Sequence, residues 1–148
     1  MNFKEIKTNK KQYLDLLLLA DEQEEMIDKY LDQGKMYVLT DKEKVVGECV
    51  ITDEGNTLEI KNIATKPEFQ GNGYGKAMIE YIIKRNANKY SYIQVGTGDS
   101  PLTVPFYKKC GFEYSHRIKD FFIKNYDHPI FEAGVQLKDM VYYKKELR

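Results

Sequence analysis

The sequence lacks the features that would assign it to a membrane or a nucleic acid. No stretch of its 148 residues is long and apolar enough to cross a bilayer, and residues 1–11 lack the apolar core of a secretory signal. We therefore expect a cytoplasmic protein that does not act on membranes. Lys plus Arg total 23 and Asp plus Glu total 23, so no net charge attracts nucleic acid, and we expect no nucleic-acid partner.

Cysteine and histidine are scarce as well. Cys49 and Cys110 fit no metal-ligand spacing, and in a reducing compartment two such thiols are more often buried than bridged. His116 and His128 have no cysteine or second histidine at ligand spacing, so the sequence predicts no metal site. With only 4 Pro and 10 Gly the composition is that of a folded protein, and its length predicts a single domain over residues 1–148.

The first half of the chain predicts two helices followed by a meander of three strands. Apolar residues recur at helical spacing before Gly34, and Asp21 with Glu24 resembles a capping box. The pattern then becomes rich in Val, Ile and Tyr and is broken by short polar turns. The expected elements are helices over 9–20 and 21–34 and strands over 36–40, 44–52 and 57–65.

The second half alternates helices with strands. Tyr74, Ala77, Met78, Tyr81 and Ile82 form the apolar stripe of a helix that packs on a sheet. The expected elements are helices over 73–85 and 103–109, a strand over 90–97, and two last strands over 113–124 and 135–145 joined by a loop over 125–134.

A glycine-rich loop, Gln70-Gly71-Asn72-Gly73-Tyr74-Gly75, connects a predicted strand to a predicted helix. Backbone N–H groups and the positive end of a helix dipole meet there, which suits a pyrophosphate. The loop has no Gly-Lys-Ser/Thr ending of a P-loop, and its glycines are too close for G-x-G-x-x-G. The remaining alternative is a turn that binds nothing.

Two motifs resemble those of one enzyme family. Gln70, Gly73 and Gly75 match the Gln/Arg-x-x-Gly-x-Gly/Ala signature of the GCN5-related N-acetyltransferase (GNAT) family, and the segment 106–112 looks like its Tyr-x-x-x-Gly-Phe motif. The resemblance covers nearly the whole chain. It implies an α+β fold in which about four helices flank a mixed central sheet of about six to seven strands.

The same resemblance implies an activity. The expected reaction moves the acetyl group of acetyl-CoA, the co-substrate, to an amino group of a small-molecule or polyamine-like acceptor by direct attack in a ternary complex. Two alternatives stay open, namely acetylation of a protein lysine or N-terminus and a non-catalytic CoA-binding sensor. Exposed sheet edges and the aromatic tail are compatible with a homodimer as well as a monomer.

The resemblance also places the cofactor along the chain. The pantetheine arm would pair with the backbone of the strand before the loop, and the loop would hold the pyrophosphate. Ser100 stands where the family often has an asparagine that bonds the pantetheine arm, and a simple helix N-cap is the alternative for it. The expected cofactor-binding residues are Ile63, Ala64, Thr65, Gln70, Gly71, Asn72, Gly73, Tyr74, Gly75, Lys76, Ser100 and Tyr107.

Two residues carry the expected catalysis. Tyr107 matches the family tyrosine that acts as general acid near the thioester sulfur, and the alternative is a tyrosine that only packs its helix. Glu59 lies eleven residues before Gln70, where one branch of the family has its base glutamate. The alternative for Glu59 is a solvated strand face, since Lys61 lies two positions on.

The acceptor side is predicted from the tail. Acidic residues interleaved with aromatic ones suit a cationic amine. The alternative is that the aromatic side chains pack the core and the acids only solvate its rim. The residues concerned are Asp120, Asp127, Glu132 and Asp139, with Phe121, Phe122, Tyr126 and Phe131.

Overall fold

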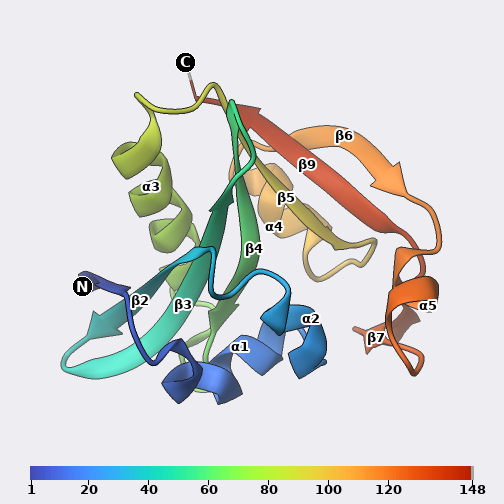
Figure 1. Cartoon of the computed structure of the whole chain (residues 1–148), viewed down its shortest axis with the longest axis horizontal. Helices are drawn as coiled ribbons and strands as arrows, with labels where there is room; N and C mark the ends of the chain where they lie inside the picture. Colours follow the sequence, from blue (N-terminus) through green and yellow to red (C-terminus); the bar gives the residue numbers. More distant parts are fainter. Residues whose placement is uncertain (148) are drawn as a thin grey trace.

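A mixed sheet of seven strands forms the centre of the protein (Figure 1). The computed structural model describes residues 1–147. Every neighbouring pair of strands is antiparallel except β4 and β5, which run parallel. In spatial order the strands are β1 (Asn2–Ile6), β2 (Lys35–Asp41), β3 (Lys44–Asp53), β4 (Thr57–Thr65), β5 (Tyr92–Gly98), β9 (Met140–Glu146) and β6 (Glu113–Ile118).

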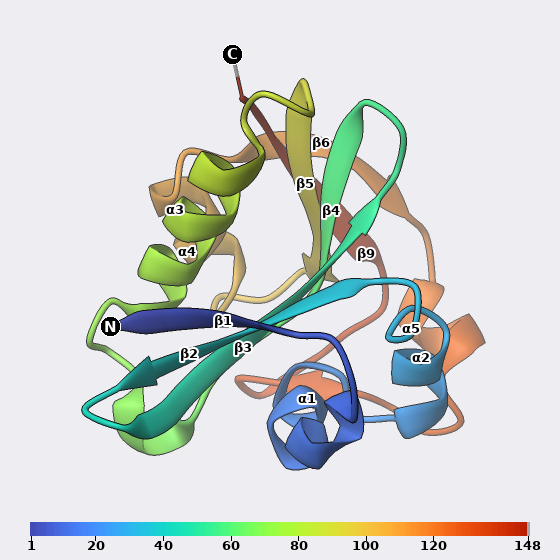
Figure 2. The same ribbon diagram turned by 60° about the vertical axis from the view of Figure 1, so that its left-hand side comes forward.

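Helices cover both faces of this sheet, as Figure 2 shows. None of the helices within residues 1–147 is long and apolar enough to cross a membrane. The helical elements are η1 (Lys10–Tyr13), α1 (Leu14–Ala20), α2 (Glu24–Asp28), η2 (Pro67–Phe69), α3 (Tyr74–Asn86), α4 (Val104–Lys109) and α5 (Phe121–Asn125). A small separate hairpin pairs β7 (Phe131–Glu132) with β8 (Val135–Gln136).

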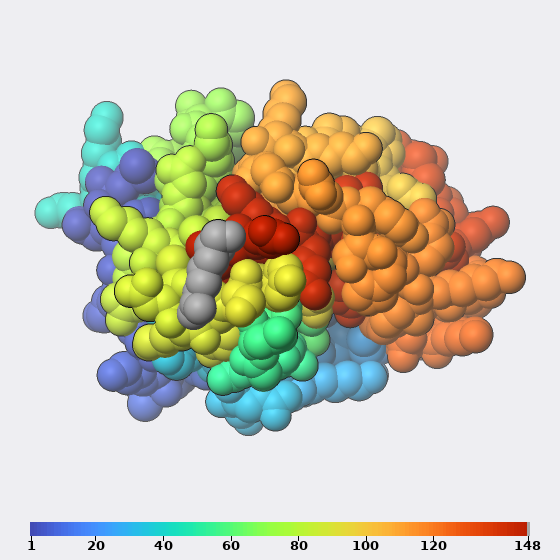
Figure 3. All heavy atoms as spheres, turned by 90° about the horizontal axis from the view of Figure 1, so that it is seen from above, coloured from blue at the N-terminus to red at the C-terminus, as the bar shows by residue number. Residues whose placement is uncertain are grey.

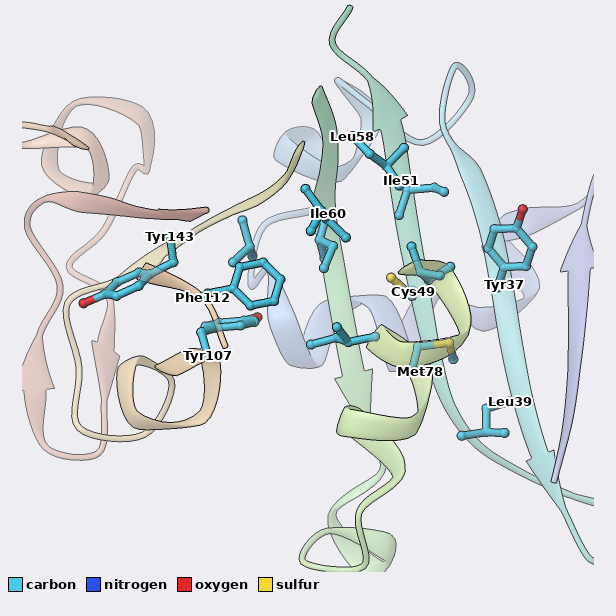
Figure 4. Close-up of a cluster of buried hydrophobic side chains, with 14 of the residues drawn as sticks. Tyr37, Leu39, Cys49, Ile51, Leu58, Ile60, Met78, Tyr107, Phe112 and Tyr143 are labelled. Atoms are coloured by element: carbon cyan, nitrogen blue, oxygen red, sulfur yellow. The ribbon is translucent and has the colours of Figure 1, made fainter. Parts of the chain in front are cut away.

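The alternation of side chains along β3 builds two hydrophobic cores. Cys49 and Ile51 join the core under α3 and α4, where Figure 4 shows Met78 of α3 against the strands. Val50 points to the other face, into the core that Leu17 of α1 completes. Full burial of an aliphatic side chain of this size contributes about 1.5–3 kcal/mol, so the sheet is anchored from both sides.

The predicted fold class, α+β with a mixed sheet of six to seven strands, is confirmed, and residues 1–147 contain five α-helices where about four were expected. The predicted strand over 113–124 is wrong beyond Ile118. Asp120 adopts a left-handed backbone (φ 56°) and starts α5, a single turn that buries Phe122 against Ile130 and Leu137. Burial of this one aromatic ring overrides the strand propensity of the segment.

Other departures lie at the ends of elements. The predicted helix over 21–34 shrinks to α2, since Lys10 Nζ binds the carbonyls of Leu31 and Gly34 and holds that stretch in turns. The capping position of α2 is Gln23, not Asp21. The predicted strand over 135–145 divides into β8 and β9, and β1 was not predicted.

One irregularity opens the sheet. β4 pairs with β5 only from Thr57 to Ile60, although β4 continues to Thr65. A bulge in the same stretch shifts the register of β4 against β3, so that Ile51 faces Ile60 and Val50 faces Asn62. The second half of β4 therefore keeps its β3 neighbour and loses its β5 neighbour.

Candidate active site

A cavity of about 400 Å³ lies where β4 and β5 part. Its walls come from segments that are far apart in the sequence, and Figure 3 shows how the C-terminal part of the chain, orange to red, gathers on one side of the molecule. The lining includes residues 60–65 of β4, residues 95–98 of β5, Asp21 and Glu22 after α1, Gln70, Tyr107 of α4, and Phe122, Tyr126, Ile130, Phe131, Glu132, Leu137 and Met140 of the tail.

The predicted pantetheine-binding residues form one edge of the cavity. Ile63, Ala64 and Thr65 all line it, and their backbone pairs with β3 on one side only. The backbone groups of this half-strand that face away from β3 are therefore available to an extended ligand that runs alongside.

The glycine loop adjoins this edge. Gly71 and Gly73 have φ values of 81° and 82°, and a Cβ atom on either would meet nothing within 4 Å. Within residues 1–147 the N–H groups of positions 71–76 have no backbone acceptor, and the next bond of this kind runs from Ala77 to Gly73. Gln70 donates to the carbonyl of Thr65 at 3.2 Å and so ties the loop to β4. Open space before free amides at the start of α3 suits an anion.

Side chains of the glycine loop make contacts that hold its conformation. Tyr74 donates a 2.5 Å hydrogen bond to Asp41 in the β2–β3 hairpin, which lowers the pKa of that carboxyl group. Asn72 donates to the carbonyl of Phe69 at 3.0 Å, and Lys76 Nζ lies 4.0 Å from Glu80. These three side chains thus contact other parts of the protein, while the backbone N–H groups of the same residues have no backbone acceptor within residues 1–147.

Tyr107 is buried in the wall of the cavity, between Phe106 and Phe112 at ring distances of 5.1 and 5.9 Å. Figure 4 shows its ring beside Phe112, with the hydroxyl directed toward the central strands. Burial raises the pKa of this phenol, so it keeps its proton at neutral pH. A protonated phenol in a cavity wall is a proton donor for charge that develops nearby.

Ser100 lies close by but does not line the cavity. Its hydroxyl accepts hydrogen bonds from the N–H groups of Leu102 and Thr103 at 3.2 and 3.4 Å, in the turn before α4, whose capping position is Thr103. The same hydroxyl donates to Glu132, which is a cavity residue. Contact of Ser100 with the cofactor stays a prediction, and its observed effect is to hold Glu132.

Glu59 is buried, so the solvated strand face considered for it is wrong. Its Oε1 accepts from Gln94 at 2.6 Å, and its Oε2 lies 2.7 Å from Lys61 Nζ. Lys61 lines the cavity and Glu59 does not. The structure therefore does not bring Glu59 to the cavity beside Tyr107, and its role as a base stays a prediction.

The four acids of the tail differ in position. Glu132 lines the cavity with Phe122, Tyr126 and Phe131. The other three do not line it. Asp139 binds Arg117 and the N–H of Asp120, Asp120 occupies the capping position of α5, and Asp127 contacts His128.

Sequence reasoning missed Asp21, which also lines the cavity. Tyr126 donates to its Oδ1 at 2.6 Å and Tyr30 to its Oδ2 at 3.1 Å, and burial raises the pKa of this carboxyl group. Asp21 was interpreted as part of a capping box, and no sequence signal links it to Tyr126, which lies 105 positions away. Within residues 1–147 no group of three or more His, Cys, Asp or Glu side chains is placed to hold a metal ion.

Comparison with known proteins gives consistent matches along the chain. The model of an acetyltransferase (GNAT) domain matches residues 32–114. The chain is similar to YvbK of Bacillus subtilis (strain 168), an uncharacterized N-acetyltransferase, at 39% identity over 137 residues that cover 90% of this chain and 88% of YvbK.

Two solved structures with a bound cofactor are similar over almost the entire length. A GNAT family acetyltransferase from Elizabethkingia anophelis with acetyl-CoA bound has 34% identity and a TM-score of 0.92, covering 98% of this chain and 97% of that one. A Bacillus subtilis acetyltransferase in complex with CoA has 34% identity and a TM-score of 0.88, with the same coverage.

Proposed function

Since the chain belongs to the GNAT acetyltransferase family and is an acetyl-CoA-dependent N-acetyltransferase, we propose that its acceptor is a small, polyamine-like amine that attacks the thioester directly in a ternary complex. One observation carries this proposal. The cavity at the parting of β4 and β5 joins a free strand edge and a buried tyrosine to the carboxylates of Asp21 and Glu132.

We propose that the donor lies across the free edge and the loop. Ile63, Ala64 and Thr65 would bond the amides of the pantetheine arm, and the amides of positions 71–76 would hold the pyrophosphate. The unpaired strand edge, the two left-handed glycines and the open space before them support this assignment. Bound there, acetyl-CoA supplies an acetyl group activated as a thioester.

Tyr107 is the proposed general acid. When the amine nitrogen bonds to the acetyl carbon, the carbon–sulfur bond breaks, and the sulfur takes its proton from the Tyr107 hydroxyl. The position of Tyr107 in the cavity wall supports this role, and its buried phenol stays protonated until the negative charge forms nearby. The enzyme also gains by holding the two reactants in contact.

The proton that the amine loses needs an acceptor, and two carboxylates compete for this role. Glu59 would be reached only by way of Lys61, to which it is paired. Glu132 lines the cavity itself, is held by Ser100, and is near enough to Tyr107 to raise the pKa of that phenol further.

The test is thiol release from acetyl-CoA across small amines, a lysine-containing peptide and a blank without acceptor. We expect release with small cationic amines above the blank. Thiol release with the peptide and with none of the small amines would show that the acceptor is a protein amino group. Binding of acetyl-CoA without release in any sample would identify a sensor and refute the proposal. A cytoplasmic location and a homodimer also stay proposals, to be checked by fractionation and by light scattering.

A further inference from the structure

We infer that Asp21 binds a second positive group of the acceptor, so that the preferred acceptors carry an ammonium group besides the amine that is acetylated. This inference rests on the proposed function and adds the class of acceptor to it. Asp21 lies in the turn between α1 and α2, and Tyr107 lies on α4, so the two belong to different walls of one cavity.

A chain of hydrogen bonds fixes Asp21 as an acceptor. Asn62 Nδ2 donates to the carbonyl of Leu17 at 3.0 Å and to the Tyr30 hydroxyl at 3.1 Å. The Tyr30 hydroxyl thereby accepts one bond and directs its own proton to Asp21 Oδ2, while Tyr126 serves Oδ1. The backbone N–H of Gln23 donates to the same carboxylate, so every donor to Asp21 within residues 1–147 is a neutral group.

The charges around the cavity are unbalanced. Asp21, Glu22 and Glu132 line it, and against these three acids stands one cation, Lys61, which is already paired with Glu59. Among the side chains of residues 1–147, Asp21 has no cationic partner within salt-bridge distance. A half-buried carboxylate without a counter-charge favours a cation brought by the ligand, because desolvated charges are costly when unpaired.

A second observation points to a ligand at the same place. Asn62 is 3% exposed and lines the cavity, yet its Oδ1 has no hydrogen-bond partner within residues 1–147. A buried oxygen without a donor costs about 1–3 kcal/mol, so a donor from a bound molecule, directly or through a water, would stabilise it. An ammonium group has three N–H donors, which is enough for Asp21 and this neighbour.

The walls of this region suit an organic cation. Phe122, Tyr126 and Phe131 line the cavity, and aromatic faces attract ammonium groups in addition to the carboxylate. Figure 2 shows α2, which follows Asp21, beside α5, which carries Phe122. The N–H of Asp127 also binds Gln23 Oε1 at 3.3 Å, so the turn and the tail are joined around the proposed subsite.

The experiment compares three acceptors of equal chain length, which end in an ammonium, a methyl or a carboxylate group opposite the reacting amine. With the wild-type protein we expect kcat/KM for the diamine to exceed that for the methyl compound by about tenfold or more. In Asp21→Asn this preference should vanish, and the carboxylate compound should improve. The KM for acetyl-CoA should stay unchanged.

The matched control is Asp15→Asn, which removes an exposed acid from the neighbouring α1 and should retain the diamine preference. Equal turnover of the diamine and the methyl compound by the wild-type protein would overturn the inference. So would an equal loss with both compounds in Asp21→Asn. If that variant fails to fold, the wild-type comparison decides alone. No thiol release with any amine would instead refute the proposed function, and the inference with it.

Discussion

Lys61 Nζ lies 2.7 Å from Glu59 Oε2, and of these two residues only the lysine lines the cavity. Lys61 sits at the bulge of β4, and Gln94 of β5 binds the other oxygen of Glu59 from the parallel strand. These contacts therefore hold β4 and β5 together just before the two strands part. Glu59 therefore has a structural role, since it links β4 to β5 next to the cavity, and it is also a candidate for catalysis.

The proton acceptor can be identified with Glu59→Gln and Glu132→Gln. The variant that loses the acceptor should lose the acid limb of the kcat pH profile and about 10²- to 10⁴-fold in kcat. Because Glu132 lines the cavity, we expect this result for Glu132→Gln. An unaltered pH profile in Glu59→Gln would make the predicted role of Glu59 wrong. If the acid limb disappears in Glu59→Gln and not in Glu132→Gln, Glu59 is the proton acceptor.

The Tyr107→Phe variant should lower kcat by about 10²- to 10⁴-fold, because the proposed general acid is lost while the ring still packs against Phe106 and Phe112. Thermal unfolding should change little. Tyr143→Phe is the matched control, since it removes the hydroxyl of another tyrosine of the same core outside the cavity lining. A Tyr107→Phe enzyme of nearly wild-type rate would mean that Tyr107 only packs its helix.

The Gly73→Ala variant should raise the KM for acetyl-CoA by about tenfold or more. A side chain there is strained at φ 82°, at a cost of about 1–2 kcal/mol, and a methyl group occupies the open space before the free amides. Gly55→Ala carries the same strain, at φ 86° with nothing within 4 Å, in the turn between β3 and β4. Both variants should lose similar stability. An equal KM for acetyl-CoA in the two would contradict a phosphate site at the loop.

Glu48→Met should stabilise the protein at neutral pH. Glu48 is fully buried, neither carboxylate oxygen has a partner within residues 1–147, and burial raises its pKa well above the usual value. The folded state keeps a proton that the unfolded chain releases, so wild-type stability falls as pH rises above the unfolded pKa, up to the raised folded one. An apolar side chain of similar size removes the cost of a buried polar group without a partner, which is about 1–3 kcal/mol.

Urea unfolding between pH 4.5 and 8 measures this effect. The gain from Glu48→Met should grow with pH, and Glu113→Met, at an exposed glutamate, should show no such trend. A gain that is constant over this range would mean that Glu48 titrates alike in the folded and unfolded protein.

The local hydrophobic pattern predicted secondary structure correctly where the structure of a segment depends on residues within that segment. The apolar stripe through Met78 and Ile82 predicted α3, because these residues need only one sheet face to pack on. The pattern failed for residues 119–124, whose aromatic side chains read as a strand. There the decisive contact, Phe122 with Ile130 and Leu137, is made within the tail after the chain has turned back.

The sequence by itself determined which residues are proposed for the donor side of this enzyme. Gln70 to Gly75 and the segment around Tyr107 are each contiguous, so residue type and spacing alone lead to the roles proposed for them. Only the tertiary structure decided which residues are proposed for the acceptor side, because the parted strands bring Asp21, Lys61 and Glu132 into one cavity from three distant segments. Their partners, among them a tyrosine 105 positions from Asp21, are set by the packing of the two ends of the chain against the sheet.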